Sequence, residues 1–187
     1  MQPLRVEWGD LSAFEPAPDD VATHAAALSI AYNEPNNARL LGHTQLLSAD
    51  DVIDHYASLV EEGGHPFLLF RDGQLSGDGD LRGVGDGECE FAFLIADPGA
   101  QGKGLGTRFA TMICAAGFAR LDLARIYASI VPANTGSRRV FEKLGYTLDE
   151  TAAARGFAED PEDLVMSIDR ATFERTNAAA LAAIRFD

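Results

Sequence analysis

The chain has 187 residues, with 29 acidic and 15 basic side chains and a formal net charge of −14. A chain of this length buries about 70% of the surface that its unfolded form exposes, so we expect one domain over residues 1–187. The acidic balance argues against a nucleic-acid partner, which needs a basic footprint. No apolar run approaches a membrane span, and we expect a cytoplasmic protein with no membrane partner.

An acidic surface attracts cationic ligands, although ordinary solubility accounts for it equally well. The two cysteines, Cys89 and Cys114, match no metal-binding or redox spacing, and the four histidines show no ligand spacing. A calcium loop that starts at Asp78 fails, because Arg82 occupies a ligand position and Cys89 stands where the bidentate Glu should be. We therefore predict no metal site.

The first expected elements are a short strand at 4–8, a loop rich in Pro and Asp, and a helix at about 19–32. Asn33-Glu34-Pro35 should end that helix, because proline disfavours helix in the residue before it. Ser48 and Asp51 form a capping-box pattern that opens a second helix. The apolar face of that helix comprises Val52, Tyr56, Leu59 and Val60.

Two turn signals follow and predict a three-stranded meander. Asp72-Gly73 joins strands at 66–71 and 75–84, and Gly85-Asp86-Gly87 leads into a strand at 88–95. Helices and strands then alternate, which indicates a mixed α/β (α+β) sheet. The remaining expected elements are a helix at 104–120, a strand at 125–131, a helix at 135–144, strands from Tyr146 and at 164–168, and a closing helix from about Ala171.

A glycine-rich turn, Gln101-Gly102-Lys103-Gly104-Leu105-Gly106, separates the strand at 88–95 from the helix at 104–120. Free backbone N–H groups at the positive end of a helix dipole suit phosphate binding. An ordinary strand-to-helix turn gives the same pattern, so the context decides. Basic residues also gather near this turn: Lys103, Arg108, Arg138, Arg139 and Lys143.

A second block runs Asn134-Thr135-Gly136-Ser137-Arg138-Arg139-Val140-Phe141-Glu142-Lys143-Leu144-Gly145-Tyr146, separated from Gln101 by the length of one helix and one strand. Asn134 and Ser137 suit a helix N-terminus and Gly145 a helix C-terminus. Together the two blocks resemble the GNAT N-acetyltransferase superfamily. The segment 32–42 is similar to the ribosomal-protein-alanine N-acetyltransferase branch.

The resemblance implies a mostly antiparallel central sheet flanked by helices, with splayed central strands that admit acetyl-coenzyme A. The strand at 126–131 would splay from its neighbour, and Leu94 to Ala96 would bind the pantetheine arm through their backbone. Gly104 and Gly106 would let phosphate approach the chain closely. The implied cofactor contacts are Leu94, Ile95, Ala96, Gln101, Gly102, Lys103, Gly104, Leu105, Gly106, Thr107, Asn134, Ser137, Phe141 and Lys143.

The superfamily transfers acetyl to an amine by direct attack, and the amine must lose a proton. Glu88 and Glu90 share one strand face, and Glu90 lies nearer the expected thioester, which makes it the candidate base. Solvated charges at a strand start are the alternative. Many relatives carry a tyrosine at the position of Phe141 that protonates the departing thiolate, so Ser137 becomes the candidate acid.

The acceptor is a primary amine, on either a protein N-terminus or a small molecule. Candidate acceptor contacts are Asn33, Glu34, Arg39 and Glu88. A peptide predicts an open acidic groove, and a small molecule predicts a closed pocket walled by the first two helices. A non-catalytic coenzyme A-binding or interaction module remains the alternative function. The chain could be a monomer or a homodimer.

Overall fold

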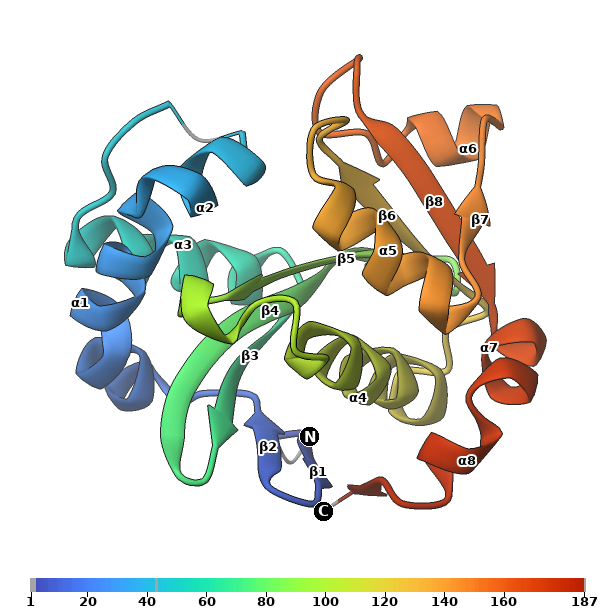
Figure 1. Cartoon of the computed structure of the whole chain (residues 1–187), viewed down its shortest axis with the longest axis horizontal. Helices are drawn as coiled ribbons and strands as arrows, with labels where there is room; N and C mark the ends of the chain where they lie inside the picture. The colour runs from blue at the N-terminus through green and yellow to red at the C-terminus, as the bar shows by residue number, and fades with distance from the viewer. Residues whose placement is uncertain (1–2, 43, 187) are drawn as a thin grey trace.

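The computed structural model describes residues 3–42 and 44–186, and within them the strands form a nine-stranded sheet (Figure 1). Its order is β7-β8-β6-β5-β4-β3-β2-β1-β9. Every pairing is antiparallel except that of β5 with β6. The strands are β1 (Arg5–Trp8), β2 (Leu11–Phe14), β3 (His65–Arg71), β4 (Gln74–Gly85), β5 (Glu88–Ile95), β6 (Arg125–Ile130), β7 (Thr147–Leu148), β8 (Leu164–Asp169) and β9 (Arg185–Phe186).

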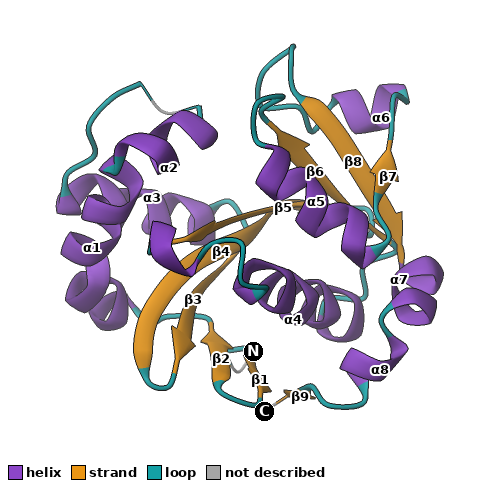
Figure 2. Cartoon of the chain, in the orientation of Figure 1, coloured by secondary structure: helices purple, strands orange, loops and turns teal. Residues whose placement is uncertain are grey.

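Helices cover both faces of this sheet, which confirms the expected mixed architecture of a mostly antiparallel sheet flanked by helices. In Figure 2, α4 and α5 lie side by side in front of the strands, and α1, α2 and α3 gather on the left. None of the helices in the described part of the chain combines the length and apolarity needed to cross a bilayer. The helices are α1 (Pro18–Asn33), α2 (Pro35–Leu40), α3 (Ala49–Glu61), α4 (Leu105–Arg120), α5 (Thr135–Leu144), α6 (Ala152–Arg155), α7 (Arg170–Thr176) and α8 (Ala178–Leu181).

The two faces of the sheet belong to different cores, as the alternation of side chains along β3 shows. Phe67 and Leu69 pack into the large core beneath α4 and α5. Leu68 and Phe70 point the other way and pack with α1 and α3. Because successive side chains of a strand point to opposite faces, β4 and β5 likewise present one row to α4 and another to α1 and α3.

The predicted splay lies between β5 and β6. These strands pair in parallel over only three residues, Glu88, Cys89 and Glu90. Beyond Glu90, β5 stays paired with β4 up to Ile95, whereas β6 continues along β8 up to Ile130. The two strands therefore form a fork, and the backbone of β5 is open on the side of β6.

The structure also contains elements that the sequence analysis missed. The loop expected after β1 holds β2, a four-residue strand between β1 and β3. Pro35 does follow the end of α1, but it is also the first residue of α2, because its fixed φ suits the first helical position. The expected closing helix is divided into α7 and α8 at Asn177, and β9 then pairs with β1.

Candidate functional site

The glycine-rich turn is built as a backbone cradle. Gly102 and Gly104 have φ angles of 74° and 87°, a backbone conformation that residues with a Cβ rarely adopt. Gly104 is the N-cap of α4, and a Cβ added at either glycine would meet no atom within 4 Å. The glycines therefore leave open space beside free N–H groups at a helix N-terminus, as anion binding requires.

Gly106 lies where α4 packs closely on β5. A Cβ at Gly106 would lie 3.2 Å from Cε2 of Phe93, so its missing side chain lets α4 pack closely on β5. We had expected Gly106, like Gly104, to allow phosphate to approach the backbone. Gly102 and Gly104 have open space at their missing side chains, whereas Gly106 packs on β5. Phosphate binding at these glycines stays a prediction.

A cleft of about 280 Å³ opens beside this turn, and we call it the loop cleft. Residues of α2, β5, the glycine turn and α5 line it, so it lies at the fork of the sheet. Ten of the predicted cofactor residues are among those that line it: Leu94, Ile95, Gln101, Gly102, Gly104, Gly106, Thr107, Asn134, Ser137 and Lys143.

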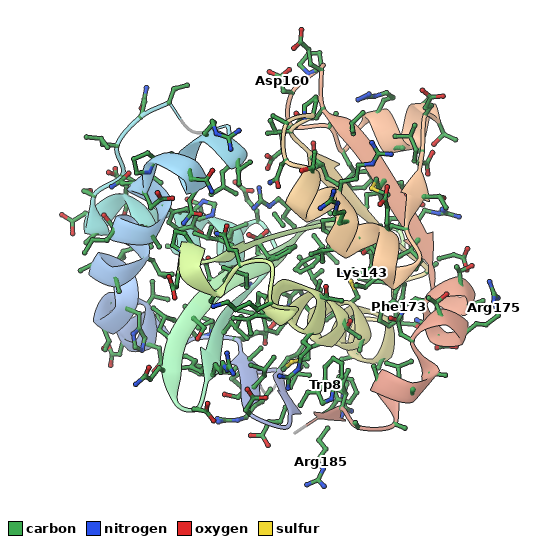
Figure 3. The ribbon with its side chains drawn as sticks, in the orientation of Figure 1. Trp8, Lys143, Asp160, Phe173, Arg175 and Arg185 are labelled. Carbon is green, nitrogen blue, oxygen red and sulfur yellow. The ribbon has the colours of Figure 1, made fainter. Side chains whose placement is uncertain are left out.

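The side of the loop cleft opposite the turn is the N-terminal part of α5. Asn134 caps the helix by accepting a hydrogen bond from the Ser137 N–H at 3.0 Å, and its amide donates to the Leu40 carbonyl at 3.1 Å. Arg139 and Lys143 line the cleft as well, and Figure 3 labels Lys143 on α5. These cations give the cleft a local positive charge on an acidic protein.

Backbone groups of β5 face the fork at alternating residues. The Ala96 N–H donates to the Ser76 carbonyl at 2.9 Å, and in an antiparallel ladder every second residue bonds the same neighbour. Leu94 and Ala96 therefore face β4, while Phe93 and Ile95 face the open side. This corrects the expected backbone set of Leu94 to Ala96, although Leu94 still lines the cleft.

Three other predicted cofactor residues do not line the loop cleft. Phe141 is 2% exposed, and its ring packs against Phe91, Phe93 and Tyr146 in the core. Leu105 is buried in the same core, and Lys103 is exposed on the turn. Phe141 therefore supports the strand behind the cleft and takes no part in its surface.

Asn37 is a cleft residue that the sequence analysis missed. Its side chain is 1% exposed and donates to the carbonyls of Ala31 and Ala96, at 2.9 Å and 3.3 Å. The Gln101 amide donates to Asn37 at 2.9 Å and to the Ile95 carbonyl at 3.1 Å. These bonds connect α2, the end of β5 and the glycine turn. The only sequence signal was Pro35, which opens α2.

Two further hollows continue from the loop cleft along the α1 and α3 side of β4 and β5. The inner hollow, of about 290 Å³, shares Leu41, Phe93 and Leu94 with the cleft. The outer hollow, of about 440 Å³, shares His55, Arg82 and Glu159 with the inner one. The three spaces therefore lie in sequence. The other polar lining residues of the hollows are Tyr32, Asp51 and Asp80 in the inner one, and Ser58, Glu62 and Glu90 in the outer one.

Glu90 lies at the last paired position of the fork and lines the outer hollow. It is 6% exposed, and its Oε1 atom accepts no hydrogen bond from the described residues. Burial, with repulsion from Glu159, raises the pKa of Glu90 to about 7, against the opposing effect of Arg82. This carboxyl therefore exchanges a proton near neutral pH.

An ion network separates the inner and outer hollows. Arg82 binds both carboxylate oxygens of Asp80, at 2.6 Å and 2.8 Å, and Oε1 of Glu159 at 2.6 Å. Beneath the inner hollow, the hydroxyls of Tyr32 and Tyr56 donate to Oδ2 of Asp78 at 2.6 Å and 2.7 Å. Burial raises the pKa of Asp78 to about 6. No three or more candidate ligands among the described residues are placed to hold a metal ion.

The predicted acceptor residues have other contacts and do not line the hollows. The Asn33 side chain donates to the Leu47 carbonyl at 2.7 Å and accepts from the Leu47 N–H at 2.9 Å. Glu34 caps α2, and the exposed Arg39 binds Asn36. Glu88 accepts the Tyr127 hydroxyl at 3.1 Å. The residues that do line the hollows come from α1, the segment between α2 and α3, α3, β4, β5 and the loop after α6, which no local motif connects.

Comparisons with known proteins agree with this geometry. The chain is 35% identical over 99 residues to "Probable N-acetyltransferase YjcK" of Bacillus subtilis (strain 168), a match that spans 51% of this chain and 55% of that protein. Mycobacterium smegmatis RimJ, solved with CoA-disulfide, has the same fold, with a TM-score of 0.73 and 20% identity over 98% of this chain and 94% of that one.

Two other solved structures with this fold have different acceptors in their descriptions. Aminoglycoside acetyltransferase AAC(6')-Ib with coenzyme A has a TM-score of 0.72 and 22% identity, over 93% of this chain and 99% of that one. Ribosomal-protein-S5-alanine acetyltransferase of Vibrio fischeri has a TM-score of 0.70 and 16% identity, over 88% and 96%. The acetyltransferase (GNAT) domain profile matches residues 14–147, and the chain belongs to that family.

Proposed function

We propose that this protein moves an acetyl group from acetyl-coenzyme A to a primary amine by direct attack. The observation that carries the proposal is the position of Glu90. This buried carboxyl has an unpartnered oxygen and a pKa raised to about 7, and it lines the outer of the two hollows that continue from the loop cleft. A structural carboxylate is ordinarily hydrogen-bonded, whereas a catalytic base needs a free oxygen and a pKa near the working pH.

The loop cleft fits the pyrophosphate and pantetheine of the donor. The cradle at Gly102 and Gly104 leaves space where a phosphate would meet backbone N–H groups. Arg139 and Lys143 add positive charge, and the backbone groups of Phe93 and the N–H of Ile95, which face the open side of β5, suit an extended amide chain. The bound donor supplies the activated acetyl thioester, and the related fold is known with coenzyme A in AAC(6')-Ib and with CoA-disulfide in RimJ.

Glu90 would remove the proton from the acceptor amine, directly or through water. An α-amine with a pKa near 7.7–8.0 is about one-tenth neutral at pH 7, whereas lysine is below one part in a thousand. A base with a pKa near 7 takes up the proton of either amine as attack proceeds. The acidic hollows would also concentrate cationic amines beside the thioester.

Ser137 would assist the departing thiolate. It lines the loop cleft on α5, whereas Phe141, one turn further along, is buried and has no proton to give. A thiol of pKa about 8.5 leaves reasonably well without full protonation. The Ser137 hydroxyl would therefore act as a hydrogen-bond donor of modest effect.

The test is acetyl-coenzyme A-dependent thiol release with a panel of amines, on wild type and two matched variants. Glu90→Gln should lower kcat by about 10²–10⁴-fold and remove the rise in rate as pH increases through about 7. Glu88→Gln, two residues away on the same strand face, should stay within threefold of wild type. Equal activity of the two variants would exclude Glu90 as the base. Cofactor binding without release for any amine would indicate a non-catalytic coenzyme A-binding protein.

A further inference from the structure

We infer that Glu159 is a positioning residue for the acetyl transfer: it holds the guanidinium of Arg82 away from Glu90, and so keeps an oxygen of that carboxylate open to the acceptor amine. This inference rests on the proposed function and deepens it, because it names a second carboxylate on which the base depends. In this role Glu159 acts through Arg82 and exchanges no proton with the amine.

Arg82 and Glu90 occupy directly opposite positions of β4 and β5, and both line the outer hollow. Opposed residues of antiparallel strands have Cβ atoms about 4.5–5.5 Å apart, and opposite charges at such positions attract one another. Among the residues that the structure describes, however, no ion pair or hydrogen bond joins these two side chains. The cation opposite Glu90 therefore leaves that carboxylate without an ion pair.

The guanidinium of Arg82 is held in another direction by two other carboxylates. Its Nε and Nη2 atoms bind the two oxygens of Asp80, two residues away on the same strand, at 2.6 Å and 2.8 Å. Its Nη1 atom binds Oε1 of Glu159 at 2.6 Å. Without Glu159 the Nη1 donors would lose their acceptor, and the unpartnered Oε1 of Glu90, on the opposed residue, would be available to receive them.

The loop between α6 and β8, which carries Glu159, is anchored to β6. The Glu159 N–H donates to the Ser129 hydroxyl at 3.1 Å, and that hydroxyl donates to the buried Asp163 at 2.8 Å. Phe157 of the same loop stacks on Tyr127 of β6, with ring centroids 4.4 Å apart. These contacts lie on both sides of Glu159 in the sequence, so the fold places its backbone independently of the ion pair.

The charges around Glu90 act in the same direction as this geometry. Burial is the main cause that raises the pKa of Glu90 to about 7, and repulsion by Glu159 comes next. Arg82 opposes the rise in this pKa, whereas Asp80 adds to it. Other ionisable side chains on the surrounding elements are His55 and Glu62 of α3 and Tyr127 of β6. Loss of Glu159 removes a repulsion and releases a cation, and both changes lower the pKa of Glu90.

The experiment titrates Glu90 directly, through the NMR shift of its carboxyl carbon in glutamate-labelled protein, with Glu90→Gln to assign the signal. Glu159→Ala removes both the charge and the acceptor for Arg82, whereas Glu159→Gln removes the charge and keeps an acceptor. We expect Glu159→Ala to lower the pKa of Glu90 by about one unit, as a new ion pair predicts. Glu159→Gln should lower it by less than half as much, because Arg82 stays held.

Glu162→Ala is the matched control, since it removes an exposed carboxylate further along the same loop. It should change the pKa of Glu90 by less than about 0.2 unit, because exposed charges are screened. In thiol release, the rise of kcat/KM with pH should move to lower pH in Glu159→Ala and stay in place in Glu162→Ala. The kcat of Glu159→Ala at pH 8 should fall by roughly 3- to 10-fold, because its base is weaker and already paired. Thermal unfolding verifies that each variant is folded.

The outcomes separate the inference from the function on which it rests. Equal pKa shifts in Glu159→Ala and Glu159→Gln would mean that Glu159 acts by its charge alone, which contradicts its hold on Arg82. An unchanged or higher pKa of Glu90 in Glu159→Ala would overturn the inference entirely. The titration needs no acceptor, so a lowered pKa in protein that releases no thiol with any amine would overturn the proposed function and leave the ion-pair arrangement standing.

Discussion

The loop cleft and the two hollows meet at Phe93 and Leu94, yet they are built in different ways. Most residues that line the loop cleft come from two short segments, at 101–107 and 134–143, where glycines and helix N-termini expose backbone groups, and the rest come from 37–41 and 93–95. The hollows depend on side chains that come from α1, α3, β4, β5 and the loop after α6. A backbone site binds a group that the whole family shares, whereas side chains can be exchanged one at a time. We therefore expect donor binding in the first region and acceptor choice in the second.

A pair of glycine substitutions tests whether the glycine-rich turn of the loop cleft binds the donor. Gly104→Ala places a Cβ where phosphate would lie, and Gly73→Ala imposes similar strain in the hairpin turn, where φ is 76° and the space is also open. Both should lose about 1–2 kcal/mol of stability. Only Gly104→Ala should weaken acetyl-coenzyme A binding, by roughly tenfold or more, as measured by calorimetry. Equal affinities would show that the cradle does not bind the donor.

The pH dependence of folding stability tests whether Glu90, in the outer hollow, is a buried carboxylate without a partner. The pKa of Glu90 is higher in the folded chain, at about 7, than its ordinary value of 4.5. Between these values the native state holds more protons than the unfolded state, so the stability contribution of Glu90 falls as pH rises. Glu90→Gln should therefore raise the melting temperature at pH 8 by roughly 2–8 °C and change it less at pH 5. A lower melting temperature at pH 8 would mean that the ionised carboxylate is well paired in the fold.

The smallest expected effect concerns Ser137, which faces the loop cleft. Ser137→Ala keeps the backbone N–H that bonds Asn134 and removes only the hydroxyl. Thiol release should slow by about 2- to 10-fold, with little change in cofactor affinity. A poorer leaving group should enlarge the difference if the hydroxyl assists the thiolate. An unchanged rate would leave departure of the thiolate to water.

Sequence reasoning predicted the fold and the loop cleft from local signals. Expected helices at 104–120 and 135–144 match α4 and α5 within one residue at each end, because glycine and Asn134 caps mark their boundaries. The same reasoning missed β2, whose four residues are too few for a clear alternation, and α2, whose opening proline was interpreted only as a stop signal. Because α2 was not predicted, Asn37 was not recognised as a cleft residue.

The residues that line the hollows could not be predicted from the sequence, because their contacts join distant parts of the chain. Arg82 meets Glu159 across 77 positions of the chain, and Tyr32 meets Asp78 across 46. No periodicity or cap relates such residues, since their contact depends on how the sheet and helices pack. The candidate base Glu90 could be named from its strand position, but its missing hydrogen-bond partner appeared only in the fold.

Because β5 leaves β6 at the fork but stays paired with β4, its backbone amides should exchange hydrogen with solvent at two different rates. The amides of Leu94 and Ala96 are directed at β4 and should exchange slowly, whereas those of Phe93 and Ile95 face the cleft and should exchange quickly. Among the described residues, strand pairing between the two arms of the sheet is confined to 88–90, with further backbone bonds from Ala124 and Arg125 to the Gly87 carbonyl. Glu90 therefore lies where the two arms of the sheet separate.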